Sequence, residues 1–249
     1  MRRASRSTCI TQRSIPRREL LRKTPDSYLT QMAQTSLNGL RLYGVAAFDS
    51  ALHQPLAEGT TSVQFRSIAG IVSPARYARV TVDDGELRDY TRILEEVQAN
   101  TAILPAPPGT VFRSRDNLAR WLELHYFTLT QAIGSIEGHG QARLTISRSA
   151  GVDPANGTPA DVRESSKQLL ATASQSMRVL RGQAAATVSL PIPEDDTTIV
   201  AQASFLVDLE RWSVFSDLVQ KEDTRHTSLD FHLSGPWPPY DFVRMQFGG

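Results

Sequence analysis

The clearest strand signal in the chain lies in TSLDFHLSGPWPPYDFV, residues 227–243. Over residues 228–234 the apolar residues Leu229, Phe231 and Leu233 alternate with polar ones. Alternation with a period of two is typical of a strand with one buried face. The residues that follow hold three prolines, one glycine and two large aromatic residues, a combination that makes a stiff segment. The sequence therefore predicts a last strand over 228–234 and a rigid aromatic segment directly after it.

Not counting the loop, this last strand is the sixth element between residues 141 and 234. The elements before it are a strand at 142–147, a loop at 151–157, a helix from Pro159 to about Arg181 with Thr158 as its N-cap, strands at 184–190 and 198–207, and a short helix capped by Asp208. The order strand, helix, strand, strand, helix, strand is that of ferredoxin-like folds. We expect a split βαβ arrangement, with an antiparallel sheet and helices on one of its faces.

The first half of the chain mixes helices and strands as well. Its predicted elements are strands at 40–45 and 63–72, a helix at about 86–99, an extended connection at 103–112, and a helix over 115–136 with Ser114 as its N-cap. Three prolines within residues 105–108 exclude a helix or a central strand there, and we expect Pro74 to end the strand that precedes it. The fold class is therefore α+β in two domains: an N-terminal domain at 40–138, which ends in a long helix, and a C-terminal ferredoxin-like domain at 139–249.

Residues 1–39 differ from both domains in their charge. They hold eight Lys and Arg against two acidic residues, a net charge of +6, while the rest of the chain holds 19 basic and 24 acidic residues, a net charge of −5. We expect this basic leader to be disordered, because so polar a segment buries too little surface to offset its ordering entropy. An organelle transit peptide, a nucleic-acid-binding arm and a translation start at Met32 are alternatives that the composition leaves open.

Several classes of function are disfavoured by what the sequence lacks. An acidic body argues against a nucleic-acid surface, and the absence of a long apolar run argues against a membrane span. Cys9 is the single cysteine, so an intrachain disulfide and a Cys-based zinc site are excluded. No nucleophile elbow, phosphate loop or zinc-protease motif is present. We therefore expect no enzyme, no catalytic residue, no metal site and no cofactor. The loose set His226, Asp230 and His232 is interpreted as the solvated face of a sheet.

The aromatic segment after the last strand has two interpretations. Trp237 and Tyr240 can fold back as a lid on the sheet, or the segment can be a preformed docking element for another protein. For the second interpretation, the predicted partner-binding residues are Trp237, Pro238, Pro239, Tyr240 and Phe242.

Residues 235–243 closely resemble the G-P-W-P-P-Y-x-F-V terminus of the GvpL/GvpF family of gas vesicle proteins. Residues 42–45 are similar to the opening strand of that family, and residues 103–112 to its L-P-x-x-x-G-T-V-F segment. The resemblance covers about residues 40–247 and leaves the basic leader outside. The positions that it marks as structural are Tyr43, Gly44, Pro105, Gly109, Thr110, Phe112, Gly235 and Pro236.

Two segments depart from the family pattern. Residues 106–108 read Ala-Pro-Pro where the family is closer to Leu-Arg-Phe, and residues 141–144 read Gln-Ala-Arg-Leu where the family commonly has a Glu and a Lys. These differences bear on partner contacts more than on the fold.

The resemblance implies a non-enzymatic accessory or structural protein of gas vesicle formation, located in the cytoplasm and at the gas vesicle. Its implied partners are the small hydrophobic shell protein and other gas vesicle accessory proteins. Shell subunits expose apolar surface before they assemble, so a protein that covers them or seeds their ordered addition prevents aggregation. The alternative is a stand-alone ligand-binding or regulatory α+β module.

Overall fold

The structure is a computed structural model that describes residues 38–48, 57–78, 82–150 and 159–243. All of these described residues belong to one compact unit. Nearly all of the predicted leader (residues 1–37), the predicted loop at 151–157 and the N-cap at Thr158 lie outside the described residues.

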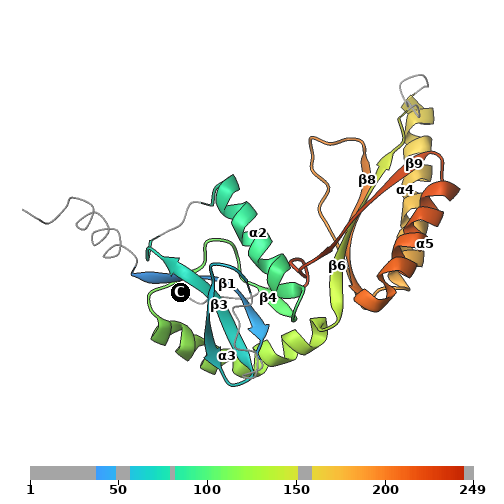
Figure 1. Cartoon of the computed structure of the whole chain (residues 1–249). Helices are drawn as coiled ribbons and strands as arrows, with labels where there is room; N and C mark the ends of the chain where they lie inside the picture. The colour runs from blue at the N-terminus through green and yellow to red at the C-terminus, as the bar shows by residue number, and fades with distance from the viewer. Residues whose placement is uncertain (1–37, 49–56, 79–81, 151–158, 244–249) are drawn as a thin grey trace, which may run out of the picture. The chain divides into compact units, whose positions relative to one another are not determined.

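The first sheet is built entirely from antiparallel pairs (Figure 1). Its strands are β1 (Gly39–Ala47), β2 (Thr61–Phe65), β3 (Ile68–Ala75), β4 (Ile103–Pro105) and β5 (Val111–Phe112). Their order is β2-β3-β1-β4, and β5 also pairs with β1. The two ends of the Pro-rich connection, β4 and β5, therefore both pair with the central strand β1. The sequence predicted this connection as extended.

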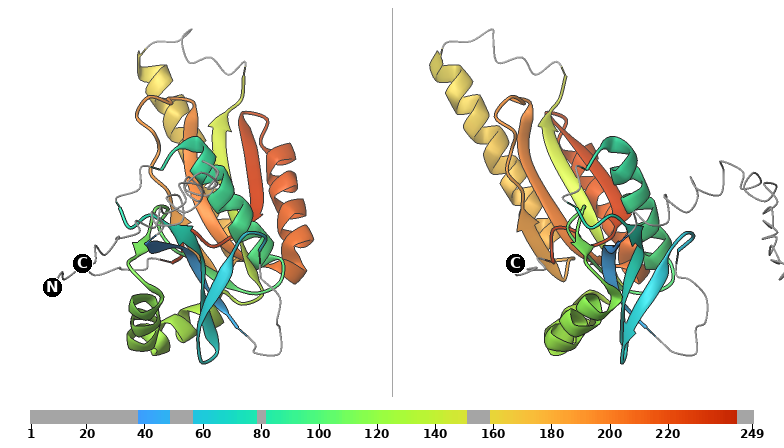
Figure 2. Two further views of the ribbon diagram at one scale, coloured as in Figure 1. Left: turned by 60° about the vertical axis from the view of Figure 1, so that its left-hand side comes forward. Right: turned by 90° about the vertical axis from the view of Figure 1, so that its left-hand side faces the viewer.

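Two helices cover opposite faces of this sheet, α2 (Asp84–Gln98) and α3 (Arg115–Ile136), as Figure 2 shows. Leu42 and Val45 of β1 pack with the apolar stripe of α3, while Tyr43 and Ala46 pack with that of α2. Both helices lie where the periodicity predicted them. The predicted N-cap Ser114 is confirmed, because its side chain accepts a hydrogen bond from the backbone N–H of Asn117.

The predicted single strand at 63–72 is wrong, because the segment forms a hairpin of β2 and β3. The chain reverses at Arg66 and Ser67, with Arg66 in the left-handed region at φ 53°. The sequence carries only a weak turn signal there, because Arg66 is not a typical turn former and Ser67 stands alone without a glycine, proline or asparagine beside it. Pro74 does not end the ladder either: it pairs with Leu40 inside β3, which continues to Ala75.

The second sheet follows the predicted element order. Its elements are β6 (His139–Arg148), α4 (Pro159–Arg181), β7 (Ala186–Ser189), β8 (Ile199–Asp208), the 3-10 helix η2 (Leu209–Arg211), α5 (Trp212–Arg225) and β9 (Leu229–Trp237). The strands are antiparallel in the order β7-β8-β6-β9. The α+β class is confirmed, and this sheet is compatible with the ferredoxin-like arrangement. The division proposed at residue 138 falls between α3 and β6.

The two faces of the second sheet differ in polarity. Ala142, Leu144 and Ile146 of β6 form a core with α4 and α5, which lie on the same side of the sheet (Figure 1). The alternate residues Gln141, Arg143 and Thr145 lie on the other face. Thr145 pairs with Gln202 of β8, and Arg143 with Ser204, so the polar character continues across the sheet.

Candidate docking site at the C-terminal motif

The motif begins inside the last strand, because β9 continues through Gly235 and Pro236 to Trp237. Gly235 has a φ of 127°, and a Cβ at this position would lie 2.5 Å from the carbonyl oxygen of Gln141 and 2.8 Å from the ring of Trp212. Only glycine combines this backbone conformation with such close packing. The last strand therefore carries the motif directly against the start of β6.

The aromatic part of the motif turns toward the first sheet. The ring centroid of Tyr240 lies 6.3 Å from that of Tyr90 on α2, and Tyr90 lies 6.4 Å from Tyr43 of β1. The Tyr90 hydroxyl donates a 2.5 Å hydrogen bond to the carbonyl oxygen of Ala106, next to Pro105. Tyr90 thus joins three sequence segments that the family resemblance singled out separately: the opening strand, the Pro-rich segment and the terminal motif.

Further contacts connect the motif to the first half of the chain. The side-chain amide of Gln98 on α2 donates to the carbonyl oxygen of Trp237 at 3.2 Å. Phe242 and Val243 pack against the core between the first sheet and α3, to which Leu206 of β8 also belongs. The motif is therefore a connection between the two sheets and not a free tail.

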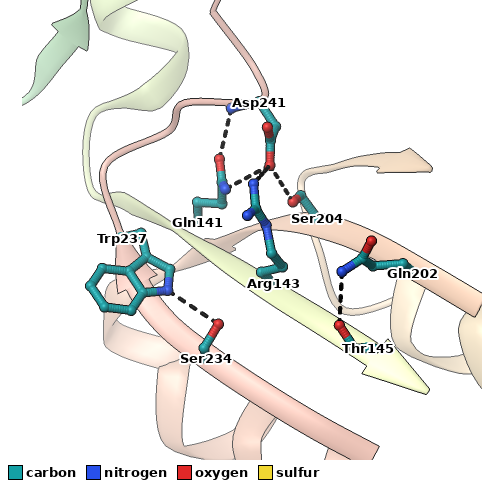
Figure 3. Close-up of polar contacts among 8 residues, drawn as sticks. All are labelled: Gln141, Arg143, Thr145, Gln202, Ser204, Ser234, Trp237 and Asp241. Atoms are coloured by element: carbon teal, nitrogen blue, oxygen red, sulfur yellow. Dashed lines mark hydrogen bonds and ion pairs between the residues drawn. The ribbon is translucent and has the colours of Figure 1, made fainter. Parts of the chain in front are cut away.

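The polar part of the motif is Asp241, which binds the polar face of the second sheet (Figure 3). Its carboxylate oxygen Oδ2 accepts hydrogen bonds from Gln141 Nε2 at 2.8 Å, Arg143 Nη2 at 2.9 Å and Ser204 Oγ at 2.5 Å. The backbone N–H of Asp241 donates to Gln141 Oε1 at 2.8 Å. Gln141 and Ser204 are buried. Since buried polar groups need partners, Asp241 satisfies this part of the sheet.

The two tyrosines of the contact are uncharged at neutral pH. Burial, with a smaller contribution from the negative charge of Glu95, raises the pKa of Tyr240 to about 12. Burial also raises the pKa of Tyr90, and the neighbouring Tyr240 adds to that shift. Desolvation disfavours the phenolate form of both tyrosines. The contact between the Tyr90 and Tyr240 rings therefore requires that both hydroxyl groups stay protonated.

The predicted partner-binding residues differ in exposure. Pro238 and Pro239 are buried, whereas Trp237, Tyr240 and Phe242 are half-buried. Trp237 Nε1 donates to Ser234 Oγ at 3.3 Å (Figure 3). Trp237 lies beside the exposed pair Gly235 and Pro236, so its surroundings are more open than those of the prolines.

The positions marked as structural gather around β1. Tyr43, Gly44 and Pro105 are buried, and a Cβ on Gly44 would lie 2.6 Å from the carbonyl oxygen of Leu104. Gly109 has a φ of 81°, in the turn that brings the carbonyl oxygen of Thr110 to the N–H of Leu42 at 2.9 Å, and Phe112 pairs with Leu40.

Sequence reasoning missed two features. The first is the set of hydrogen bonds that Asp241 forms with the second sheet. The alternation along β6 predicted a polar face there, but it did not show which residue binds that face. The second is an apolar pair on the outer face of α3, Leu124 and Phe127, which are 79% and 73% exposed. These side chains lie one turn apart on α3. They are outside the apolar stripe that predicted the helix, so nothing in the sequence indicated their exposure.

The described part of the chain contains no group of three or more His, Cys, Asp or Glu residues arranged to hold a metal ion. Within the loose set predicted as solvated, Asp230 accepts a hydrogen bond from Ser149 Oγ at 2.6 Å, and His226 lies 3.6 Å from Glu222. None of the described helices is long and apolar enough to cross a membrane.

Similar proteins share both sequence and fold with this chain. Gas vesicle protein F1 of Halobacterium salinarum is 22% identical over 200 residues, covering 77% of this chain and 84% of that protein. Gas vesicle protein F2 of the same organism is also 22% identical, over 75% of this chain and 81% of its own length.

Two crystal structures show the same fold. That of the gas vesicle protein GvpF from Anabaena sp. PCC7120 matches with a TM-score of 0.70 at 16% identity, over 85% of this chain and 98% of that one. That of GvpF from Microcystis aeruginosa matches with a TM-score of 0.64 at 16% identity, over 84% and 100%. A family model described as gas vesicle synthesis protein GvpL/GvpF matches residues 39–178 and 159–244. Since these ranges include most of the chain, the protein belongs to the GvpL/GvpF family and is associated with gas vesicles.

Proposed function

We propose that this protein is a non-enzymatic accessory protein of gas vesicle formation that binds the small hydrophobic shell protein and helps its nucleation or assembly. It acts in the cytoplasm and at the vesicle, together with other accessory proteins. The observation that carries the binding role is the exposed apolar pair Leu124 and Phe127, in a chain of a gas vesicle family. The proposal requires no catalytic residue, metal or cofactor.

The physical basis of this role is the covering of apolar surface. Two large side chains that project from one helix face offer an apolar contact to a subunit that exposes the same kind of surface before assembly. The flanking residues Glu123 and Thr128 on α3 are exposed and polar, so the pair has the apolar centre and polar surround of a protein contact.

The C-terminal motif is the second proposed contact. Trp237 is half-buried, next to the buried Pro238 and Pro239, while Tyr240 and Phe242 pack against the first half of the chain. Tryptophan supplies a large apolar area together with an N–H group, a combination enriched at protein contacts. In this proposal the motif both joins the two sheets and presents its tryptophan ring to the partner.

A pull-down with the shell protein tests both contacts. We expect Leu124→Ser/Phe127→Ser to lose most of the bound shell protein and Trp237→Ala to lose part of it. The control is Leu170→Ser/Val214→Ser, which changes two exposed apolar side chains on α4 and α5 and should bind as the wild type does. Thermal melting of each variant ensures that only folded proteins are compared.

Each outcome of the pull-down is decisive for part of the proposal. If the wild type retains no shell protein, the proposed function is wrong. If binding is retained by the α3 variant, the helix face is not the contact. If Trp237→Ala alone binds as the wild type does, the motif serves only to connect the sheets. Copurification of a tightly bound small molecule would instead favour the ligand-binding alternative.

A further inference from the structure

A groove of about 390 Å³ lies beside α4, away from the motif and the α3 pair. One wall is a stripe of the last turns of α4 that includes Met177, Arg178 and Arg181. The other side is formed by the end of β7, the segment after it with Leu190 and Ile192, and the start of β8 with Val200. Residues 174, 177, 178 and 181 are spaced three and four apart, so this wall is one face of the helix.

The start of β8 has an open edge in this groove. β7 pairs with β8 only as far as Ser189 opposite Ala203, and one further bond joins Leu190 N–H to the carbonyl oxygen of Gln202 at 3.0 Å. The chain then leaves through Pro191 and Pro193, which have no N–H to continue the ladder. Over residues 199–201, β8 therefore pairs with β6 on one side and, among the described residues, with no strand on the other.

The groove combines apolar surface with positive charge. Ile192 is 42% exposed, and Met177 and Val200 are half-buried in the same groove. Arg178 and Arg181 are exposed, and the guanidinium group of neither forms a hydrogen bond or ion pair with another residue of the described ranges. Two unpaired guanidinium groups above an apolar floor are complementary to a carboxylate that follows apolar side chains.

We propose that this groove binds an extended segment of a partner protein. The segment adds a short strand to the open edge of β8, places apolar side chains on Met177, Ile192 and Val200, and presents a carboxylate to Arg178 and Arg181. Main-chain hydrogen bonds then supply the affinity, while the apolar floor and the arginine pair supply the specificity.

Charge favours a peptide over a nucleic acid as the occupant. A nucleic acid carries a phosphate on every residue, and the exposed acidic residues Glu194 and Asp195 follow Ile192 of the groove closely in the β7–β8 loop. A peptide can place one or two carboxylates at the arginine pair and remain uncharged elsewhere. This surface shares no residue with the proposed shell-protein contacts, so the inference goes beyond the proposed function and can fail independently of it.

The test uses the full chain and a blocked, fluorescently labelled peptide of alternating Val and Ser that ends in two Glu. Fluorescence anisotropy measures its Kd. We expect Arg178→Glu/Arg181→Glu to weaken binding about 10-fold, from two partly exposed ion pairs of about 0.7 kcal/mol each. The matched control is Arg120→Glu/Lys221→Glu, which makes the same change of net charge at exposed positions outside the groove and should leave the Kd unchanged.

Two altered probes separate the parts of the proposal. The same peptide ending in two Lys should bind at least about 10-fold more weakly, by the same ion-pair energies. A peptide N-methylated at its Val residues keeps its side chains but loses the donors for strand pairing, so it should lose most of its binding.

The inference is overturned if the folded wild type does not bind the Glu peptide, or if the Lys or N-methylated probe binds equally well. It is also overturned if the control variant loses as much affinity as the arginine variant. Displacement of the peptide by an equal concentration of a single-stranded oligonucleotide would assign the groove to nucleic acid instead.

Discussion

The two sheets of this protein are covered in different ways. β1 of the first sheet has five consecutive buried residues, from Leu42 to Ala46, because α2 and α3 pack on both of its faces. From Ala142 to Ile146, β6 of the second sheet alternates between buried and more exposed residues, because α4 and α5 cover one face only. A sheet with two apolar faces requires apolar helices on both, whereas a polar face requires polar partners. The C-terminal motif contributes to both sheets. Tyr240 adds an aromatic ring to the apolar packing of the first sheet, and Asp241 supplies the acceptor for the polar face of the second.

The largest expected effect comes from glycines at close contacts in each sheet. Gly235→Ala should lower the free energy of unfolding by about 3 kcal/mol or more, since it adds backbone strain to a clash with the Gln141 carbonyl. Gly44→Ala, whose Cβ meets Leu104, should cost about 2 kcal/mol from the clash alone. Urea denaturation measures both.

The control for these glycines is Gly134→Ala in α3, where no atom would lie within 4 Å of the new Cβ. Alanine there should raise stability by up to about 1 kcal/mol, because it is the better helix former. If Gly235→Ala does not lower the free energy of unfolding, the start of β6 can move away from the new Cβ, and the comparison of rigid contacts in the two sheets does not hold.

The next effect concerns the polar face. Asp241→Ala should lower the free energy of unfolding by about 2–3 kcal/mol, because it leaves the buried Gln141 and Ser204 without their acceptor. Asp230→Ala is the matched control on the same sheet, since Asp230 is exposed and accepts one bond from Ser149. The control should cost less than about 1 kcal/mol. Equal costs would mean that the second sheet does not depend on the motif.

A smaller effect is expected at the contact with the first half. Tyr90→Phe removes the hydroxyl that donates to the Ala106 carbonyl and should cost about 1–1.5 kcal/mol. Tyr77→Phe, at a tyrosine that is 48% exposed, should cost less than about 0.5 kcal/mol. Thermal melts followed by circular dichroism give both values. If Tyr90→Phe leaves the free energy of unfolding unchanged, ring packing alone holds the three motifs together.

The last effect is absent at neutral pH and develops in alkali. Tyr240 has its pKa raised to about 12 in the folded protein, against 10.0 as its ordinary value, so the unfolded chain releases this proton first. The stability that Tyr240 contributes is therefore fully present below pH 10 and is lost progressively between pH 10 and about 12. Tyr240→Phe should show a shallower loss of stability over this interval. Parallel curves for the wild type and the variant would contradict a buried, neutral Tyr240.

The helices could be predicted from the sequence because their signals are local. α3 begins and ends where the spacing of its apolar residues and the Ser114 cap predicted, and α2 differs from its prediction by one or two residues. The β2–β3 hairpin could not be predicted in the same way. Its turn places Arg66, a residue with no turn preference, in the left-handed region, and the pairing of the two strands holds the turn in place.

The residues of the candidate site could be predicted from the sequence, but the residues that they contact could not. The terminal motif identified Trp237 to Phe242 as unusual, and its resemblance to a family pattern led to the gas vesicle association that the family match supports. The partners of these residues lie elsewhere in the chain: Tyr90 is 150 positions before Tyr240, and Gln141 is 100 positions before Asp241. The exposure of Leu124 and Phe127 likewise depends on which face of α3 the first sheet occupies.

The sequence by itself determined the element order of the second half, the α+β class and the family, because periodicity, caps and short motifs act over a few residues. The tertiary structure alone decided that three separate motifs meet at Tyr90, that Asp241 satisfies the polar face of the second sheet, and that no described strand pairs with the start of β8 beside Arg178 and Arg181. These features depend on contacts between residues far apart in the chain, and such contacts form only when burial and hydrogen bonding offset the entropy of bringing those segments together.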